Sequence, residues 1–565
     1  MTKKRWLALA LALCLCLTGA GCGKKGSGGT GDAYAVDGDA QVSATPTPVA
    51  PGDSLTVALE AGPDSIDPTA AVSREEMTIL SHLFEGLMKW GDSGRSVAGG
   101  MAYAQAVPGM AERYEKKAGA DGSVIYTFHL RQAKWSDGKP VTAQDFVYSW
   151  QRLLDPANAA TYADLLEAVY NAYPLSMGLV QPSDLGVRAV DDVTFEVTLD
   201  YDMPWFLELC ALPITAPLRQ DVIEEWGNRW TYATDSYITN GPYQIAEWDR
   251  GYLSVEKCGE YYQTVSGPGA IRFTFSGDTA ADLSAYESGA TDFLLGVEPT
   301  SGQAGRAPYL ASYYLMFRTD RSPFDDARVR QAFSLAIDRA ALVEAQAAGQ
   351  TPAGGLVPPG AYGADGAAGA DYRTRAKESL DPSKGAYADN CAKARALLSQ
   401  AGYPEGKGLS EVTYLCPDNP AHTAIGEALA QMWQEVLGVS VTVESVEWGD
   451  FLNRCHAGEF TIARGRWVAD YNDPLAFLEL WWSESAANDA AYGEEQYDDL
   501  LERADRAEDP SLRMELMAQA EELLIGRDHA LAPLYYETLT YLKKDSLTGV
   551  CYSPLGYFIF TQVKM

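Results

Sequence analysis

The first 22 residues constrain this chain more than any other segment, because they decide where the rest of it folds. Lys3, Lys4 and Arg5 precede a twelve-residue apolar stretch from Trp6 to Leu17. About 20 apolar residues are needed to cross a bilayer, so this stretch is too short for a membrane span and is typical of a secretory signal. We therefore expect residues 1–21 to be a signal peptide and the remaining chain to fold outside the cytoplasm.

Cys22 stands directly after a run of small residues, in the segment LTGAGC. This arrangement resembles a bacterial lipobox, in which the cysteine receives a lipid and becomes the new N-terminus after cleavage. The alternative is an ordinary signal peptide with a cysteine nearby. Residues 23–53 are rich in Gly, Ser, Thr, Pro and Ala, and they bury too little apolar surface to order a chain. We predict a lipidated Cys22 and a flexible tether over residues 22–53, with the folded part at the outer face of the cytoplasmic membrane.

The charge balance excludes several classes of partner. The 565 residues include 77 acidic and 44 basic side chains, which gives a formal net charge of −33. Such a field repels nucleic acid, so we expect no nucleic-acid partner and no polybasic membrane patch. With 47% hydrophobic and 21% charged residues, the composition is that of a globular protein of several domains.

Six cysteines remain beyond Cys22 and the predicted signal peptide: Cys210, Cys258, Cys391, Cys416, Cys455 and Cys551. They could form disulfides in an exported protein. None has C-x-x-C spacing, which argues against a zinc site. Several lie in apolar or strand-like segments, where a free cysteine behaves as a small buried hydrophobic residue. The sequence leaves the pairing open and predicts no metal and no cofactor.

Helix and strand patterns mix from Ser54 onward without a repeat, which is typical of an α/β protein. Alternating or continuous apolar runs predict strands at 55–59, 124–130, 193–199, 439–446, 460–467 and 557–560. Apolar residues at helical spacing predict helices that start at Ser73 and Thr142, and further helices at 326–342 and 422–437. The stretch 351–371 is rich in Gly, Ala and Pro, and it predicts a loop.

Motifs for enzyme chemistry are missing. Only five histidines occur, and there is no H-E-x-x-H, G-x-S-x-G, P-loop or calcium-loop pattern. Carboxylates are abundant, so an acid–base pair for glycoside cleavage stays open. The 32 tyrosines and 13 tryptophans suit core packing and also a cleft for an organic ligand. We expect a binding protein that is not an enzyme, with a secreted hydrolase as the alternative.

Seven segments resemble one family, the extracytoplasmic oligopeptide-binding proteins of bacterial ABC importers (extracellular solute-binding proteins, family 5). The matching segments are SIDP (65–68), LFEGL (83–87), YTFHLR (126–131), KWSDGKPVTAQDFVYSW (134–150), TNGPY (239–243), DARVRQAF (326–333) and WVADYNDP (467–474). Their order matches the family over nearly all of residues 54–565. The segment that begins at Lys134 is highly specific to the family, and the last segment points to its oligopeptide branch.

The resemblance implies a two-lobed α/β fold of the periplasmic-binding-protein type (type II), with an additional inserted domain and a hinge between the lobes. Lobe I would comprise residues 54–74, 203–308 and 534–565. The inserted domain would comprise residues 75–202, and lobe II residues 309–533. The lobes of this family close on the ligand, and closure would be stabilised by the ligand.

Asp470 matches the family aspartate that pairs with the α-ammonium group of a bound peptide. A buried ammonium needs an anion, so the role is chemically reasonable, whereas a loop or helix-capping aspartate is the structural alternative. Arg464 matches the arginine near the peptide carboxylate, a group that suits a guanidinium fork. The neighbouring Arg466 could shift that register, and Arg464 could also be a solvated strand residue.

His422 aligns with a family histidine that serves the same carboxylate end, although a lone histidine is as well explained at a helix start. Trp467 and Tyr471 flank Asp470 and are expected in the cleft wall, with core packing as the alternative for each. The backbone from Arg464 to Asp470 would pair with the peptide as an added strand, which gives affinity without reading side chains.

Two positions depart from the family pattern. Gly62 and Met316 stand where the family has glutamates near the ligand's amine end. The resemblance therefore predicts capture of oligopeptides and delivery to the permease and ATPase subunits of an ABC importer, by a monomer that is held to the membrane by its lipid. The alternative is the same fold with another ligand: a dipeptide, a cell-wall peptide, a metal chelate, haem or a sugar.

Overall fold

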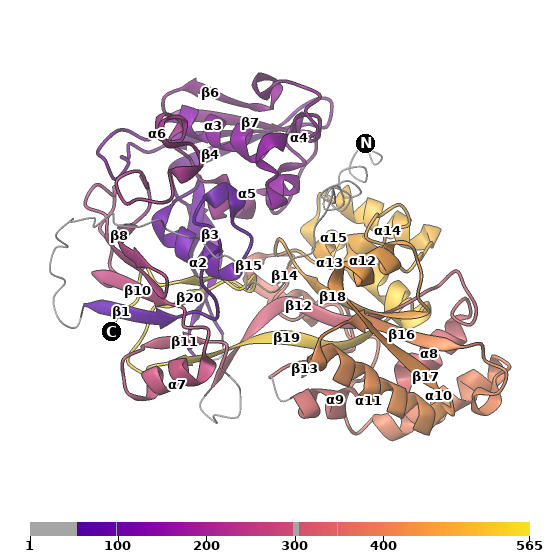
Figure 1. Cartoon of the computed structure of the whole chain (residues 1–565). Helices are drawn as coiled ribbons and strands as arrows, with labels where there is room; N and C mark the ends of the chain where they lie inside the picture. Colours follow the sequence, from indigo (N-terminus) through magenta and orange to yellow (C-terminus); the bar gives the residue numbers. More distant parts are fainter. Residues whose placement is uncertain (1–52, 98, 298–303, 347–348) are drawn as a thin grey trace, which may run out of the picture.

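A mixed sheet of eleven strands runs through the whole molecule (Figure 1). The computed structural model describes residues 53–297 (except 98), 304–346 and 349–565, so the predicted signal peptide, Cys22 and nearly all of the tether lie outside the described residues. The strand order is β17-β16-β18-β12-β19-β11-β1-β10-β9-β8, and β13 pairs with β19. The bounds are β1 Ser54–Ala58, β8 Tyr243–Asp249, β9 Tyr252–Lys257, β10 Ala270–Thr274, β11 Phe293–Leu295, β12 Gly305–Phe317, β13 Thr351–Pro352, β16 Val412–Pro417, β17 Val441–Val446, β18 Ile462–Val468 and β19 Leu531–Lys543.

The two longest strands, β12 and β19, pair antiparallel at the centre of this sheet. Strands β1 and β8–β11 lie on one side of them, here called the first half, and β16–β18 lie on the other side, the second half. In Figure 1, β12 and β19 run from one half to the other. The lobe boundaries expected at 308/309 and 533/534 fall inside these strands, so the chain crosses both positions as continuous strand.

Helices α8 Ala327–Leu335, α9 Arg339–Gln346, α10 Tyr387–Gln400 and α11 Pro420–Leu437 share a hydrophobic core with the strands of the second half. The single helix predicted over 326–342 is wrong, because the chain forms α8 and α9 there. The Asp338 carboxylate accepts a hydrogen bond from the Ala341 amide (2.9 Å) and so starts a second helix. The buried Arg339 guanidinium then donates to the carbonyls of Ser334 (2.9 Å) and Pro533 (2.6 Å).

Two four-stranded sheets contain strands from the first part of the chain. One has the order β4-β5-β7-β6, and helix α3 contacts it; the other has the order β2-β3-β20-β21 and joins residues 88–108 to the C-terminal segment. The strand predicted at 124–130 and the helix that starts at Thr142 are confirmed as β5 and α3. The bounds are β2 Met88–Ser96, β3 Ala102–Pro108, β4 Ala111–Ala118, β5 Val124–Leu130, β6 Val187–Asp191, β7 Thr194–Leu199, β20 Cys551–Tyr552, β21 Phe558–Ile559 and α3 Ala143–Leu153.

The remaining helices lie outside these two groups. Helix α2, Arg74–Leu83, begins with the predicted capping box of Ser73 and Glu76, which is confirmed. The others are α4 Ala172–Ser176, α5 Phe206–Leu209, α6 Gln220–Trp226, α7 Thr279–Glu287, α12 Trp448–His456, α13 Leu475–Leu478, α14 Glu495–Asp505 and α15 Pro510–Glu521. No helix within the described residues is both long and apolar enough to span a bilayer.

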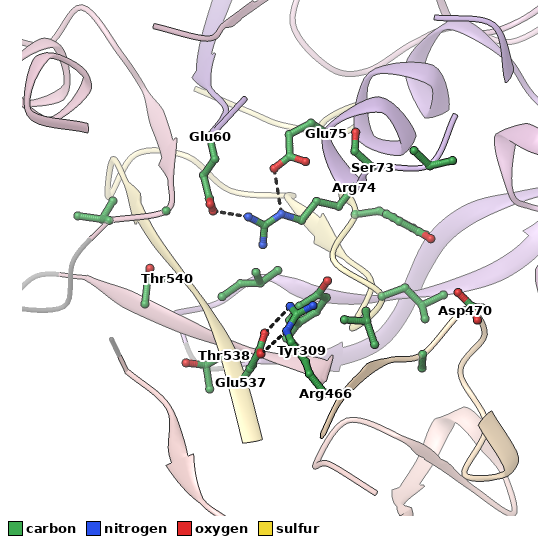
Figure 2. Close-up of a pocket in the computed structure, with 18 of the residues that line it drawn as sticks. Glu60, Ser73, Arg74, Glu75, Tyr309, Arg466, Asp470, Glu537, Thr538 and Thr540 are labelled. Carbon is green, nitrogen blue, oxygen red and sulfur yellow. Dashed lines mark hydrogen bonds and ion pairs between the residues drawn. The ribbon is translucent and has the colours of Figure 1, made fainter. Parts of the chain in front are cut away.

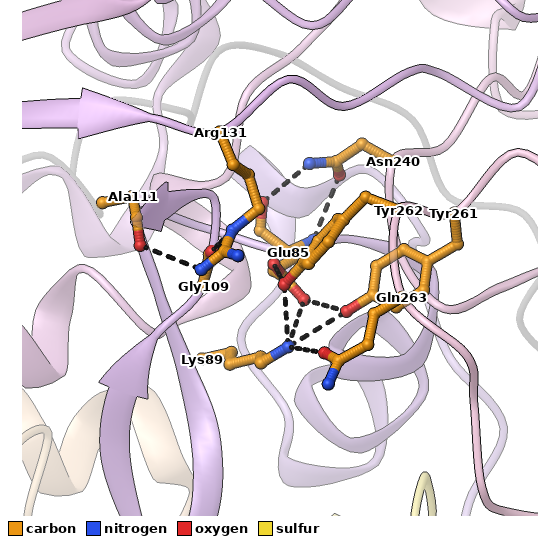
Figure 3. A network of polar contacts seen from close by, with 9 residues as sticks. All are labelled: Glu85, Lys89, Gly109, Ala111, Arg131, Asn240, Tyr261, Tyr262 and Gln263. Atoms are coloured by element: carbon orange, nitrogen blue, oxygen red, sulfur yellow. Dashed lines mark hydrogen bonds and ion pairs between the residues drawn. The ribbon is translucent and has the colours of Figure 1, made fainter. Parts of the chain in front are cut away.

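Two of the motifs that carry the resemblance meet at Glu85 (Figure 3). Its backbone exchanges hydrogen bonds with the side chain of Asn240, at 3.1 and 2.8 Å. Its carboxylate accepts from the hydroxyls of Tyr261 and Tyr262 and from the Lys89 ammonium group (3.2 Å). The motif residues Glu85 and Asn240 therefore hold α2 and the β8 region together.

The stretch 351–371, predicted as a loop, combines irregular segments with the short strands β13, β14 (Tyr362–Gly363) and β15 (Gly366–Asp371). Its anchor is the buried Glu521 carboxylate at the end of α15. One oxygen accepts from the amides of Leu356 (2.7 Å) and Val357 (3.0 Å) and from the Arg373 guanidinium. The six cysteines that the sequence left open are free and buried, as small hydrophobic residues.

Candidate functional site

A cavity of about 680 Å³ opens between the two halves of the large sheet (Figure 2). Its wall comes from the start of α2, from β12, β18 and β19, and from the segment that follows β18. Tyr162, from the 3-10 turn Thr161–Leu166, adds a side chain from the region predicted as the inserted domain. A concave site that collects side chains from such distant segments is a usual place for a ligand.

Two arginines in this cavity already have carboxylate partners (Figure 2). Arg74, the first residue of α2, lies 2.5 Å from Glu60 and 2.9 Å from Glu75. On the opposite wall, Arg466 of β18 donates two hydrogen bonds to Glu537 of β19, at 2.7 and 2.9 Å. The walls are therefore strongly polar, but these guanidinium groups are neutralised within the protein.

Asp470 lies in this cavity without such a partner. No ion pair joins its carboxylate to a cation within the described part of the chain. Burial is the main cause that raises its pKa to about 7, and the nearby carboxylates of Asp164 and Glu479 contribute to the same shift. A carboxylate in this position is stabilised when a cation enters the cavity.

Arg464 and His422 come together beside Tyr313. Arg464 is 8% exposed, and its guanidinium lies 5.2 Å from the centre of the Tyr313 ring. The Tyr313 hydroxyl is 3.1 Å from His422 Nδ1, at the start of α11. The Arg464 Nε has no hydrogen-bond partner in the structure, and no carboxylate among the described residues pairs with this guanidinium. Burial and the two positive charges of Arg464 and Arg466 lower the pKa of His422 to about 4, so the imidazole is neutral at pH 7.

The cavity and the Arg464 group lie on one face of β18. Side chains of a strand alternate between its two faces, so Arg464, Arg466 and Val468 share a face. Arg466 and Val468 line the cavity, and Arg464 continues the same row toward the core of the second half. Arg464 and Arg466 therefore lie on the same face of β18, so either guanidinium group could be the one expected near a peptide carboxylate.

Trp467 and Tyr471 are not among the residues that line this cavity. Trp467 has the opposite parity on β18, so its ring packs against the main hydrophobic core. Tyr471 stacks on Trp205 with ring centres 4.2 Å apart and planes 5° apart, and its hydroxyl donates to Glu479 (2.7 Å). These rings stabilise the surroundings of Asp470 and do not form its wall.

One edge of β18 is open next to the cavity. Strand β12 pairs with β18 from Ile462 to Val468, whereas β16 pairs with it only at Ile462 and Ala463. From Arg464 to Val468, no strand in the described residues pairs with the second edge. The backbone N–H and C=O groups of this edge are available to an extended chain.

Gly62 and Met316, the two departures from the family pattern, lie outside the cavity wall. Met316 is 8% exposed and pairs with Ala463 across the strands, while Gly62 packs against Phe275. The loss of the two glutamates therefore leaves the carboxylate of Asp470 in place.

Several residues of the cavity could not be expected from the sequence: Glu60, Arg74, Tyr309 and Glu537. The only signal was the capping box before Arg74, which fixes the start of α2 but not what it faces. Glu60, Arg74 and Glu537 are separated by up to 477 positions along the chain, so only the tertiary fold brings them together.

Comparisons with known proteins agree with this geometry. The sequence model of the bacterial extracellular solute-binding proteins, family 5, matches residues 105–489. The periplasmic oligopeptide-binding protein OppA of Salmonella typhimurium is 33% identical over 525 residues, which cover 89% of this chain and 91% of the relative. The periplasmic murein peptide-binding protein MppA of Escherichia coli is 31% identical over 91% of this chain and 94% of its own length.

Solved structures show the same fold. The unliganded open form of MppA has a TM-score of 0.76 and 31% identity, and the match covers 92% of this chain and 99% of that one. The Haemophilus influenzae OppA complex with the peptide RPPGFSPFR has a TM-score of 0.67 and 28% identity, over 92% and 100% of the two chains. The expected two-lobed α/β fold is therefore confirmed, and this chain belongs to family 5 of the bacterial extracellular solute-binding proteins.

Proposed function

We propose that this chain captures short peptides in the cavity and delivers them to the permease and ATPase subunits of an ABC importer. The observation that carries the proposal is Asp470, a carboxylate that lies in the cavity without a cation. The α-ammonium group of a peptide would supply that cation. Relatives named as oligopeptide-binding proteins, and peptide complexes among the similar structures, support the same reading.

The other end of the peptide would lie near Arg464. This guanidinium is buried, has an unpartnered Nε and sits beside the neutral His422, which suits a carboxylate. The open edge of β18 would hold the backbone between the two ends as an added strand. Arg464 and Asp470 are six positions apart, and at about 3.3 Å per residue this is roughly 20 Å, enough for about three to six extended residues.

Capture would include closure of the two halves. The unliganded open form of MppA has the higher TM-score of the two reported structures, which supports an open state for this structure. Strands β12 and β19 connect the halves, so bending at these strands would close the cavity over a ligand. The lobe boundaries expected inside the two strands belong to the same proposal.

The remaining features follow from the sequence. We propose a monomer that is anchored by a lipid on Cys22, with the tether of residues 22–53 between the membrane and the folded part, and with no catalytic activity of its own. The motivation is the lipobox-like segment, the Gly-rich composition after it, and the lack of catalytic motifs. Metabolic labelling with a radioactive fatty acid tests the anchor, because a Cys22→Ser variant should lose the label.

Calorimetric titration with trialanine and N-acetyl-trialanine tests the function. We expect trialanine to bind and the acetylated peptide to bind far more weakly, because acetylation removes the ammonium group. Asp470→Asn should cost about 2–5 kcal/mol, roughly 30- to 5,000-fold in affinity. The control is Asp499→Asn, an exposed carboxylate on α14. Equal affinity of Asp470→Asn and the parent chain for trialanine would refute the site.

A second ligand class has its own support. Relatives of similar identity are named for different ligands: MppA for murein peptide, and the Escherichia coli protein YgiS as a probable deoxycholate-binding protein, at 32% identity. Mass spectrometry of small molecules released from the purified chain on denaturation distinguishes the two. A ladder of short peptides with free amino termini supports the first proposal, and a single non-peptide compound supports the second.

A further inference from the structure

Asp470 stands at the start of a short segment whose next three side chains are all buried. Tyr471, Asn472 and Asp473 are 7%, 3% and 6% exposed. The segment lies between the end of β18 and the start of α13, outside any helix or strand. A binding group on such a segment keeps one position only if the chain around it is held by packing and hydrogen bonds. The contacts of these three side chains therefore decide where the Asp470 carboxylate lies.

Hydrogen bonds hold the far end of this segment. The Asn472 side chain accepts from the Tyr362 amide (3.0 Å) and donates to the Gly360 carbonyl (3.3 Å). The Asp473 carboxylate accepts two hydrogen bonds from the Arg513 guanidinium, at 2.6 and 3.0 Å. These bonds fix the last two residues of the segment, and the position of the first two depends on another contact.

That contact is the stack between Tyr471, the neighbour of Asp470, and Trp205. The ring centres are 4.2 Å apart and the ring planes differ by 5°. Trp205 is 6% exposed, and the Arg513 guanidinium lies 5.7 Å from the centre of its ring. Stacking of two buried rings favours one orientation of each ring. The Trp205 ring therefore contacts the segment at Tyr471 and also lies beside the arginine that binds Asp473.

Trp205 reaches this segment from another part of the molecule. It directly precedes α5, which contacts β3. The four-stranded sheet that contains β3 contacts α2 through β21, and α2 contacts β8 of the first half. Tyr471, in contrast, follows β18 of the second half. The stack is therefore a connection between the first half and the segment that carries Asp470.

We propose that Trp205 is a positioning residue for peptide binding, which acts through its stack with Tyr471 and holds the Asp470 carboxylate where the α-ammonium group of a peptide binds. The inference rests on the proposed function. A carboxylate that is already in position binds an ammonium group without the entropic cost of ordering the segment around it. Loss of the stack would release Tyr471 and with it Asp470, whereas the open edge of β18 would still pair with the peptide backbone. The loss of affinity therefore falls on peptides with a free amine.

The test is a calorimetric titration of the parent chain, Trp205→Leu and Trp205→Phe with trialanine and N-acetyl-trialanine. Leucine fills part of the space of the indole but does not stack, whereas phenylalanine offers a ring to Tyr471. In Trp205→Leu, the ratio of the affinities for trialanine and N-acetyl-trialanine should fall at least about tenfold, and Trp205→Phe should restore most of it. In the Asp470→Asn background, Trp205→Leu should change the affinity for trialanine by less than about twofold, because Trp205 acts through Asp470.

Trp248→Leu is the control, because Trp248 is an exposed tryptophan on β8, and its ratio of affinities should equal that of the parent chain. A ratio that is unchanged in Trp205→Leu would overturn the proposal. Equal loss of affinity for both peptides would indicate a general structural role and also overturn it. A ratio that falls as far in Trp205→Phe would show that stacking does not hold Asp470. If the parent chain binds both peptides equally or binds neither, the proposed function itself fails.

Discussion

His82 should make the stability of this protein fall steeply in mild acid. The imidazole is fully buried on α2, where Nδ1 donates to the Thr78 carbonyl (2.7 Å) and Nε2 accepts from the Phe560 amide (2.9 Å). The rings of Phe273 and Phe560 pack around it, with ring centres 5.5 and 5.7 Å away. A proton on Nε2 would break the bond to Phe560 and place a charge in an apolar core.

The magnitude follows from the two protonation equilibria. Burial lowers the pKa of His82 from 6.5 to about 4 in the folded state. The unfolded state takes up the proton first, so stability is complete above about pH 6.5 and is lost as the pH falls toward 4. Linkage then predicts that His82 alone removes about 2 kcal/mol from the free energy of unfolding between pH 7.5 and 5, and about 3 kcal/mol by pH 4.

Urea unfolding of the parent chain and of His82→Gln, at pH 7.5 and 5, measures this contribution. The variant should be less stable at pH 7.5, by about 1–3 kcal/mol, because the polar groups around residue 82 lose their matched partner. It should lose about 2 kcal/mol less than the parent chain on going to pH 5, because glutamine does not titrate. Parallel losses of stability in the two proteins would refute the reasoning.

Two further predictions concern buried charges. The pKa of Asp470 is raised to about 7, and only the ionised form pairs with an ammonium group, so peptide affinity should fall about tenfold from pH 7.5 to pH 6. Above about pH 8 it should fall again because the peptide's own α-ammonium group loses its proton. Calorimetry near pH 6.5 in buffers of different ionisation enthalpy should detect proton release on binding, and a flat profile between pH 6 and 7.5 would contradict the pairing. Arg513 and Asp473, both nearly fully buried, form two hydrogen bonds of 2.6 and 3.0 Å. Arg513→Met should cost about 3–5 kcal/mol in urea unfolding because it leaves a buried carboxylate unpaired, whereas Arg503→Met on an exposed helix face should cost less than about 1 kcal/mol.

The sequence could predict the fold because its motifs describe contacts that build the fold. Glu85 and Asn240 come from two different motifs and bond to each other. Arg330, from a third motif, donates to the carbonyls of Phe324 (2.6 Å) and Asp528 (2.9 Å). Such residues make the same contacts in every protein with this fold, so the resemblance identifies them without any knowledge of the ligand.

The site was less predictable, for two physical reasons. The motif identifies Asp470, which lines the cavity, but it does not assign the faces of β18, on which Trp467 lies opposite Arg464 and Arg466. Residues such as Glu537 and Glu60 carry no local pattern. They matter only because the fold places them against Arg466 and Arg74, and a sequence pattern does not contain that distance.

Two groups on and beside the cavity wall lack a charge partner among the described residues. Asp470 lines the cavity without a cation, and the Nε of Arg464, on the same face of β18 as the cavity, has no acceptor. A zwitterionic peptide would satisfy both ends at once, whereas a ligand with one blocked terminus would leave one buried charge unpaired, and that charge costs several kcal/mol. On this proposal, the preference for peptides with free termini comes mainly from the free-energy cost of leaving Asp470 or Arg464 buried without a partner, and less from the strength of either ion pair. The loss of binding free energy for a peptide with both termini blocked should then be smaller than the sum of the losses for the two singly blocked peptides. The reason is that a doubly blocked peptide does not promote closure of the two halves, so neither charge is buried without a partner.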